Sequence, residues 1–309
     1  MKKEIYNFLS SEGKTTIHTV IWTPDTEPVA ILQIAHGMVE YIERYEDFAN
    51  YLCDRGFVVV GNDHLGHGES VLTEDEWGYF AKRNGRECVL NDLYTISHII
   101  KERYPNLPFF LLGHSMGSFF ARQYFAEYGK ELTGIIIMGT GYQPRVILSA
   151  GMTLAKLLSV FKGWHHRSKF VNNMAFGSYN KKFEDGFTAY DWLSRDRAMV
   201  AKYCSEPKCQ FMFTLNGYHE MFRGLKLLTN KEYINKMPKD KPVLFISGAD
   251  DPVGNFGKGV TRVAKEFAEC GVKDIRTVLY PEARHEVLNE INRSEVYQDI
   301  YEWLATKMQ

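Results

Sequence analysis

The amino-acid sequence predicts an α/β fold: a mostly parallel sheet with helices on both faces and a helical segment inserted between two strands. Two observations predict this class. Short, continuously apolar runs alternate with longer stretches of helical periodicity, which is typical of strand–helix–strand units. The alternation stops between about residues 141 and 230 and resumes at residue 242. The 309 residues are therefore expected to form one large α/β domain with an insertion.

The elements before the insertion follow from these periodicities. Alternating polar and apolar residues at 14–23 predict an antiparallel strand, and apolar runs at 29–35 and 57–60 predict buried strands. A helix is expected near 45–55, ended by Gly56, and another at 87–104, where apolar residues recur at helical spacing. A strand at 109–112, a helix at 119–128 and a strand at 132–138 complete this part.

The insertion and the remaining elements complete the prediction. We expect a core of residues 1–140 and 231–309, and a helical lid of residues 141–230 that covers the strand ends. Strands at 242–247 and 275–280 and helices at 261–270 and 293–308 belong to the core. Within the lid, Leu154, Leu157, Leu158 and Phe161 lie at helical spacing. This stripe either packs on the protein beneath it or faces a lipid surface.

Composition excludes several classes of function. With 37 basic and 38 acidic residues, the net charge of −1 provides no field for nucleic acid. The five cysteines are scattered and odd in number, which argues against a disulfide framework. Cys204 and Cys209 form one pair without the second that a zinc site needs. No signal peptide and no run of about eighteen apolar residues is found, so we expect a cytoplasmic protein.

The segment Gly113-His114-Ser115-Met116-Gly117 carries the strongest chemical signal. A G-x-S-x-G pattern that follows an apolar strand and opens a helix is typical of a nucleophile elbow, a tight turn that projects a serine hydroxyl above the sheet. The flanking glycines allow the strand and the helix to approach closely. Ser115 is therefore the candidate nucleophile.

A serine nucleophile needs a base and a carboxylate, and in this architecture they follow in the order Ser, acid, His. His285 comes directly after the last expected strand and is the candidate base. Asp250 and Asp251 follow the strand at 242–247. We favour Asp251, because Gly248 gives the turn room and Pro252 stiffens the chain after it; Asp250 stays the alternative.

Two backbone N–H groups are expected to bind the oxyanion: that of Met116, directly after the nucleophile, and that of Met38, in the loop after the strand at 29–35. A His-x-x-His pattern at His64 and His67 could suggest a metal. No third ligand or helical spacing supports one, so we interpret it as a loop held by side-chain hydrogen bonds. Phe211, Phe213, Tyr218 and His219 are candidates for lining the cavity.

Together these motifs resemble the monoacylglycerol lipase and lysophospholipase-like group of serine α/β-hydrolases over about residues 23–304. The resemblance rests on His36-Gly37-Met38 with Glu40 and Arg44-Tyr45, on Asp63-His64-Leu65-Gly66-His67-Gly68, on the elbow, on Gly248-Ala249-Asp250-Asp251-Pro252-Val253 and on Arg284-His285-Glu286. The segment Asp191-Trp192-Leu193-Ser194-Arg195-Asp196 is similar to the bacterial branch of the group.

The resemblance implies an α/β-hydrolase fold and hydrolysis of a single-acyl lipid ester, a monoacylglycerol or a lysophospholipid, without a cofactor or a metal. The residues predict an acyl-enzyme mechanism with Ser115, Asp251 and His285 as the triad. The expected partner is a small acyl ester, with transient contact to a lipid surface through the lid. The alternatives are the same triad acting on another acyl donor, such as an aryl ester, a thioester or a peptide amide, and a non-catalytic binding protein on this scaffold.

Overall fold

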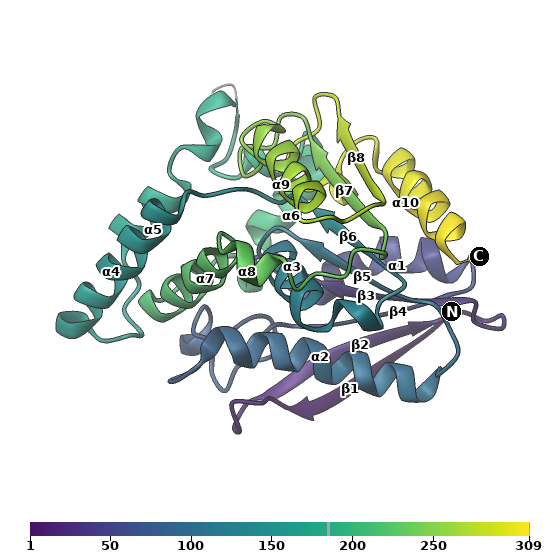
Figure 1. Ribbon diagram of the computed structural model, residues 1–309. Helices are drawn as coiled ribbons and strands as arrows, with labels where there is room; N and C mark the ends of the chain where they lie inside the picture. The colour runs from purple at the N-terminus through teal and green to yellow at the C-terminus, as the bar shows by residue number, and fades with distance from the viewer. Residues whose placement is uncertain (184–185, 309) are drawn as a thin grey trace.

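The computed structural model describes residues 1–183 and 186–308. Within these residues, one eight-stranded sheet runs in the order β1-β2-β4-β3-β5-β6-β7-β8 (Figure 1). The strands are β1 Lys2–Leu9, β2 Thr16–Thr23, β3 Ala30–Ala35, β4 Phe57–Asn62, β5 Phe109–His114, β6 Gly134–Met138, β7 Val243–Gly248 and β8 Ile275–Tyr280. The β1–β2 and β2–β4 pairs are antiparallel and all other pairs are parallel. The carboxyl ends of β3 to β8 therefore meet at one edge of the sheet.

The apolar runs become central strands because helices cover both of their faces. Every residue of β3, β4, β5, β6 and β7 is buried. Successive side chains point to opposite faces. In β5, Phe110 and Leu112 pack in one core cluster, while Phe109 and Leu111 pack in the other.

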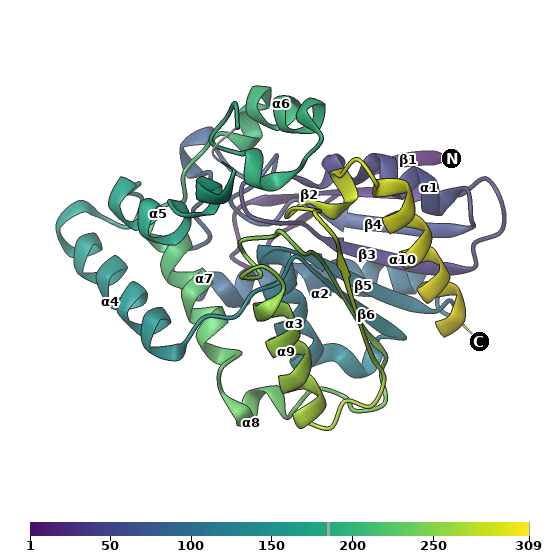
Figure 2. The same ribbon diagram turned by 90° about the horizontal axis from the view of Figure 1, so that it is seen from above.

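One group of helices covers one face of the sheet and a second group covers the other (Figure 2). The first group is α1 Glu46–Cys53 and α10 Arg293–Lys307, and the second group is α2 Gly85–Arg103, α3 Met116–Tyr128 and α9 Lys258–Glu269. Trp303 of α10 packs beside Phe110, with ring centroids 6.1 Å apart. Phe267 of α9 packs against Phe245 of β7 at 5.2 Å. The strand–helix alternation of the sequence thus corresponds to a three-layer α/β structure.

Between β6 and β7 the chain forms helices and loops. The helices are α4 Arg145–Lys162, α5 Lys169–Phe176, α6 Arg197–Ser205, α7 Leu215–Leu227 and α8 Lys231–Ile234. We call residues 141–230 the inserted segment. It shares its main core with the sheet: Leu148 and Ala155 of α4 and Met221 and Leu225 of α7 belong to the same apolar cluster as α2 and α3. Figure 1 shows α4 and α5 on the outside, with α7 between them and α3.

Short 3-10 helices connect these elements. They are η1 Ile42–Tyr45, η2 Glu74–Glu76, η3 Gly129–Glu131, η4 Tyr179–Lys182, η5 Asp191–Leu193, η6 Pro207–Cys209 and η7 Val287–Asn289. Those between residues 179 and 209 belong to the inserted segment.

The structure adds one strand that periodicity did not predict. β1 is the edge strand, and five of its eight residues are exposed, alternating with half-buried residues from Lys3 to Leu9. Its charged start, Lys2-Lys3-Glu4, hides the apolar pattern. The antiparallel strand expected at 14–23 is confirmed as β2. All five cysteines are free thiols, as their spacing indicated. Among the described residues, none of the helices combines the length and the apolar character needed to cross a bilayer.

Candidate active site

Ser115 lies at the sharp turn between β5 and α3. Its backbone has φ 53° and ψ −120°, a conformation that costs a non-glycine residue about 1–3 kcal/mol. The Ser115 N–H donates to the carbonyl of Met138 at 3.0 Å, which ties the turn to β6. The strained backbone of a nucleophile elbow, expected from the sequence, is therefore present.

The two glycines of the turn are required by close approach. A β-carbon on Gly117 would overlap the carbonyl oxygens of Ala35 and His36, and one on Gly113 would overlap the Gly117 carbonyl and the side chain of Ala121. The start of α3 therefore lies directly against the end of β3. This places the loop that follows β3 beside Ser115.

Asp251 and His285 form a buried pair. His285 Nδ1 lies 3.0 Å from Asp251 Oδ2, and the two side chains are 2% and 0% exposed. The same Asp251 oxygen accepts the Ser247 hydroxyl at 3.0 Å, and the other accepts the Val253 N–H at 2.8 Å. A buried carboxylate is costly without hydrogen-bond partners, and this one has three.

Asp250, the alternative acid, is not part of this pair. Its carboxylate pairs with Lys182 at 2.5 Å, and its side chain is one-third exposed. The ring of His114, the neighbour of Ser115, lies 4.8 Å from the ring of His285. The structure thus brings Asp251 and His285 together beside the elbow.

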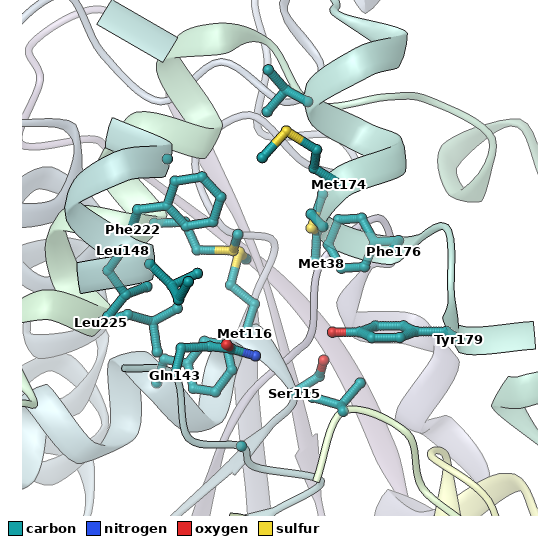
Figure 3. Close-up of a pocket in the computed structure, with 18 of the residues that line it drawn as sticks. Met38, Ser115, Met116, Gln143, Leu148, Met174, Phe176, Tyr179, Phe222 and Leu225 are labelled. Atoms are coloured by element: carbon teal, nitrogen blue, oxygen red, sulfur yellow. The ribbon is translucent and has the colours of Figure 1, made fainter. Parts of the chain in front are cut away.

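Met38, Ser115 and Met116 line one cavity of about 160 Å³ (Figure 3). Met116 is the first residue of α3, and the first N–H groups of a helix have no partner within it. Met38 follows Gly37 in the loop after β3. The next residue, Val39, has φ 58°, which is strained for a β-branched side chain. Its carbonyl accepts the hydroxyl of Tyr203 at 3.0 Å, so a residue of the inserted segment helps to hold this loop.

The remaining lining of this cavity is mostly apolar and comes mainly from the inserted segment. It consists of Phe119, Gly141, Gln143, Ile147, Leu148, Gly151, Leu154, Val171, Met174, Ala175, Phe176, Tyr179, Met221, Phe222, Leu225 and Val253. Figure 3 shows the Tyr179 hydroxyl directed toward Ser115 and the apolar side chains extending beyond it. We call this space the apolar cavity.

A second, larger cavity of about 550 Å³ shares Met38 and Phe176 with the apolar cavity. Its lining includes the amide side chains of Asn172, Asn180 and Gln210. We call it the polar cavity. Of the four residues expected to line a cavity, Phe211 lies in its wall, Phe213 and Tyr218 are fully buried in the core, and His219 lines neither the apolar nor the polar cavity. The sequence did not indicate that residues of α4 and α5 line the apolar cavity, because the apolar face of a helix looks the same whether it packs on a core or borders a cavity.

His64 and His67 belong to a loop held by side-chain hydrogen bonds, as the sequence indicated. The His64 N–H donates to His36 Nε2 at 2.8 Å, and Asp63 accepts the N–H groups of Ile42 and Glu69, each at 2.8 Å. Burial lowers the pKa of His64 to about 4 and that of His67 to about 3. Among the described residues, no group of three or more histidine, cysteine or acidic side chains is arranged to hold a metal ion.

A buried network of charged side chains lies behind the elbow. Glu40 Oε1 accepts the Gly37 N–H and the Tyr45 hydroxyl and lies 3.0 Å from His114 Nδ1. Glu40 Oε2 accepts Arg44 at 2.7 Å, and Arg44 makes two further bonds of 2.7 Å to the carboxylate of Glu286. We call Glu40, Arg44, Tyr45, His114 and Glu286 the buried network.

The buried network reaches three segments that carry candidate site residues, one of them through the bond from the Gly37 N–H to Glu40. Gly37 precedes Met38, His114 precedes Ser115 and Glu286 follows His285. Burial disfavours the charged form of His114, but the hydrogen bond and the negative charge of Glu40 outweigh it and raise the pKa of His114. For Glu40, burial acts in the opposite direction, yet His114 and Arg44 hold its pKa well below the usual range. Through these hydrogen bonds and ion pairs the network fixes three corners of the site relative to one another.

Comparison with known families identifies the chain. A family model described as serine aminopeptidase, S33, matches residues 26–292. The chain belongs to this family. Among curated proteins, this S33-family hydrolase is 28% identical over 311 residues to the monoacylglycerol lipase of Mycolicibacterium smegmatis, covering 98% of this chain and 97% of the relative. It is a monoglyceride-lipase-like α/β-hydrolase, as the motifs indicated.

Solved structures agree with this assignment. A thermostable carboxyl esterase from Bacillus coagulans, solved in complex with glycerol, is 30% identical and superposes over the full length of both chains with a TM-score of 0.92. A soluble variant of the monoglyceride lipase from Saccharomyces cerevisiae, 23% identical, covers 99% of this S33-family hydrolase and 95% of its own chain with a TM-score of 0.76, and shares the fold. The predicted α/β-hydrolase fold is confirmed.

The buried network generates a prediction about stability. We expect Glu286→Gln to lower the free energy of unfolding by about 3 kcal/mol, because Arg44, only 9% exposed, loses one of its two anionic partners. Urea denaturation measures the loss. The matched control is Asp274→Asn, which removes the acidic partner of Lys307 in a pair that is 49% and 26% exposed; we expect a loss of at most about 1 kcal/mol. Equal losses in both variants would contradict the importance of the network.

The low pKa of His67 generates a prediction about pH. In the unfolded chain His67 is protonated below about pH 6.5, whereas in the folded protein it stays neutral down to about pH 3. The free energy of unfolding therefore falls as the pH drops through this range. His67→Phe keeps the ring among Phe80, Phe211 and Phe213 and removes the titration. Between about pH 7 and pH 5 we expect this variant to lose about 2 kcal/mol less stability than the wild type.

Unfolding in urea at several pH values measures the effect of His67→Phe. The control is His98→Phe, which replaces an exposed histidine on α2. A His67→Phe protein with the pH dependence of the wild type would show that His67 is not buried in its neutral form.

Proposed function

We propose that the protein is a serine ester hydrolase that cleaves a single-acyl lipid ester, a monoacylglycerol or a lysophospholipid, through an acyl-enzyme. The observation that carries the proposal is that Ser115 opens into the apolar cavity beside the buried Asp251–His285 pair. Such a cavity fits one acyl chain, and a base oriented by a carboxylate activates a serine. The monoacylglycerol lipase and carboxyl esterase relatives support the same reaction class.

The proposed roles follow from the hydrogen bonds. His285 donates through Nδ1 to Asp251, so Nε2 is the nitrogen that accepts the Ser115 proton as the hydroxyl attacks the acyl carbonyl. The N–H groups of Met38 and Met116 bind the oxyanion. The imidazolium then gives its proton to the leaving alcohol. Water attacks the acyl-enzyme with His285 as base, the acid departs and Ser115 regains its proton.

The two cavities match the two halves of such a substrate. The acyl chain occupies the apolar cavity, and the hydroxyl-bearing leaving group faces the amide side chains of the polar cavity. The carboxyl esterase relative was solved with glycerol, a leaving group of this kind. A small polyol exchanges its hydrogen bonds with water for bonds to asparagine and glutamine at little cost.

We further propose that residues 141–230 act as a lid that touches a lipid surface. The stripe expected on α4 is divided: Leu154 and Leu158 pack inward, whereas Leu157 is 57% and Phe161 84% exposed. Other exposed apolar side chains extend this surface along α4 and α5: Val146, Ile147, Val160, Phe170 and Met174.

Two features of this exposed surface favour lipid as its partner. Ile147 and Met174 also line the apolar cavity, so the surface continues into its mouth. The exposed Lys156, Lys162 and Lys169 lie on the same helices and provide attraction to anionic headgroups. An acyl chain could therefore pass from a bilayer into the cavity without crossing water.

The function is tested with a panel of substrates. We expect hydrolysis of 1-monooleoylglycerol or lysophosphatidylcholine and of medium-chain p-nitrophenyl esters, and no activity on aminoacyl p-nitroanilides. Ser115→Ala should lower kcat by about 10⁵-fold or more and abolish labelling by a fluorophosphonate, because it removes the nucleophile. Activity confined to p-nitrophenyl acetate, or cleavage of the anilides, would replace the lipid substrate by another acyl donor. A wild type that is neither active nor labelled would indicate a binding protein.

Lipid contact is tested by sedimentation with vesicles of phosphatidylcholine that contain phosphatidylglycerol. We expect the double variant Val160→Asp/Phe161→Asp to bind at least about tenfold more weakly, because two apolar side chains no longer enter the interface. Hydrolysis of a water-soluble ester should be unchanged. Leu72→Asp, at a 56% exposed position outside the inserted segment, is the control. Equal vesicle binding by all three proteins would refute the contact.

A further inference from the structure

The indole of Trp192 packs against the imidazole of His285. Their ring centroids lie 5.1 Å apart, with an angle of 38° between the planes. The ring of His114 lies 4.8 Å from the same imidazole, and Asp251 holds its Nδ1. Two rings and a carboxylate therefore surround His285, whose side chain is 2% exposed.

The backbone around Trp192 is bonded to the loop that carries His285. The Trp192 carbonyl accepts the His285 N–H at 3.4 Å, and the Leu193 carbonyl accepts the Glu286 N–H at 2.7 Å. The N–H of Trp192 itself donates to the side chain of Asn180 at 3.0 Å. These bonds fix the indole relative to the imidazole.

A buried carboxylate reinforces the same junction. Glu290, fully buried, accepts the backbone N–H of Arg195 at 3.1 Å and that of Arg284 at 2.9 Å through one oxygen. Its other oxygen accepts the Arg195 side chain at 2.9 Å. Arg284 in turn donates to the carbonyl of Asp191 at 2.5 Å. The segment 191–195 is thus anchored to the loop 284–290 on both sides of Trp192 and His285.

We propose that Trp192 is a positioning residue for His285. It holds the imidazole against Asp251, and its ring face stabilises the imidazolium that forms when the Ser115 proton is taken. An aromatic face attracts a cation within about 6 Å of its centroid, most strongly where water is excluded. The inference rests on the proposed function, since it concerns the base of that reaction.

Trp192 is also the point at which the inserted segment acts on the base. The titratable groups that pack on His285 from the core are Asp251, after β7, and His114, at the end of β5. Trp192 comes from η5 of the inserted segment, and Tyr179 of η4 packs against its indole at 5.1 Å. The base therefore has its complete surroundings only when residues 191–195 are docked.

The test compares Trp192→Leu with Trp192→Phe on p-nitrophenyl butyrate between about pH 5.5 and pH 9. For Trp192→Leu we expect kcat to fall about tenfold with KM changed less than about twofold. The acid limb of the pH–rate profile should move to lower pH, because the protonated imidazole loses a stabilising neighbour. Trp192→Phe should restore most of kcat and the position of the acid limb.

The matched control is Trp164→Leu. Trp164 also lies half-buried in the inserted segment and also packs against a histidine, His219, at 5.2 Å. We expect wild-type kcat and an unchanged pH profile for this variant. Circular dichroism confirms folding, and Trp192→Met replaces Trp192→Leu if the latter does not fold.

Two outcomes would overturn the inference. A Trp192→Leu enzyme with wild-type kcat and acid limb would show that the indole does not act on His285. Trp192 also lines the polar cavity, and a rise in KM alone, with the acid limb in place, would show that it acts on the substrate and not on His285. Neither result affects the proposed function, provided that Ser115→Ala is inactive and that a fluorophosphonate labels the wild type. A wild type that is not labelled would remove the proposed function itself.

Discussion

The ion pair between Arg44 and Glu286 is the interaction on which the rest of the site depends. It joins the loop after β3 to the loop after β8, two segments that are far apart in sequence. Through Glu40 the same guanidinium is linked to the Gly37 N–H and to His114. Burying these charges is costly, and only the full set of partners makes the cost tolerable. The positions of the loop after β3, of the turn at Ser115 and of His285 therefore depend on one electrostatic unit.

The inserted segment contributes to the same unit from the other side. The ring of Tyr203, in α6, lies 4.9 Å from the Arg44 guanidinium. Its hydroxyl donates to the carbonyl of Val39, the residue with the strained backbone. Glu290 and Arg195 fasten residues 191–195 to the loop that carries His285. The inserted segment and the sheet thus meet through buried polar contacts as well as through the shared apolar cluster. The outer edge at α4 and α5, in contrast, turns apolar residues outward.

Much of the fold followed from the sequence, because buried parallel strands and amphipathic helices have distinct periods. The apolar runs that became β3 and β4 and the G-x-S-x-G turn at Ser115 are local signals, and each lies where it was expected. That an acidic residue after β7 would approach His285 followed from strand order, because parallel strands end at one edge, and Gly248 and Pro252 favoured Asp251 over Asp250. β1 was missed since its apolar residues lie on both faces of the edge strand and show no alternation: Ile5 and Leu9 are exposed, while Tyr6 and Phe8 pack on the core.

The surroundings of the site could not be predicted in the same way. Arg44 and Glu286 were part of a family resemblance, but their pairing depends on how two distant loops fold back over the sheet. Trp192 lay in a recognisable motif with no indication that its ring would reach His285. The walls of the apolar cavity come from helix faces whose residue types also suit ordinary core packing. Periodicity shows which face of a helix is apolar but not whether a neighbour or a void lies opposite.

The division of the apolar cavity between two parts of the chain has a consequence for how such a hydrolase diversifies. Ser115 and Met116 lie on the sheet scaffold, while most of the walls come from one continuous stretch that begins at Gly141 and ends at Leu225. Replacements on the inner faces of α4, α5 and α7 can therefore reshape the space without moving the groups at the strand ends. Selection in a laboratory library confined to these three helices could explore new acyl donors while the chemistry stays intact.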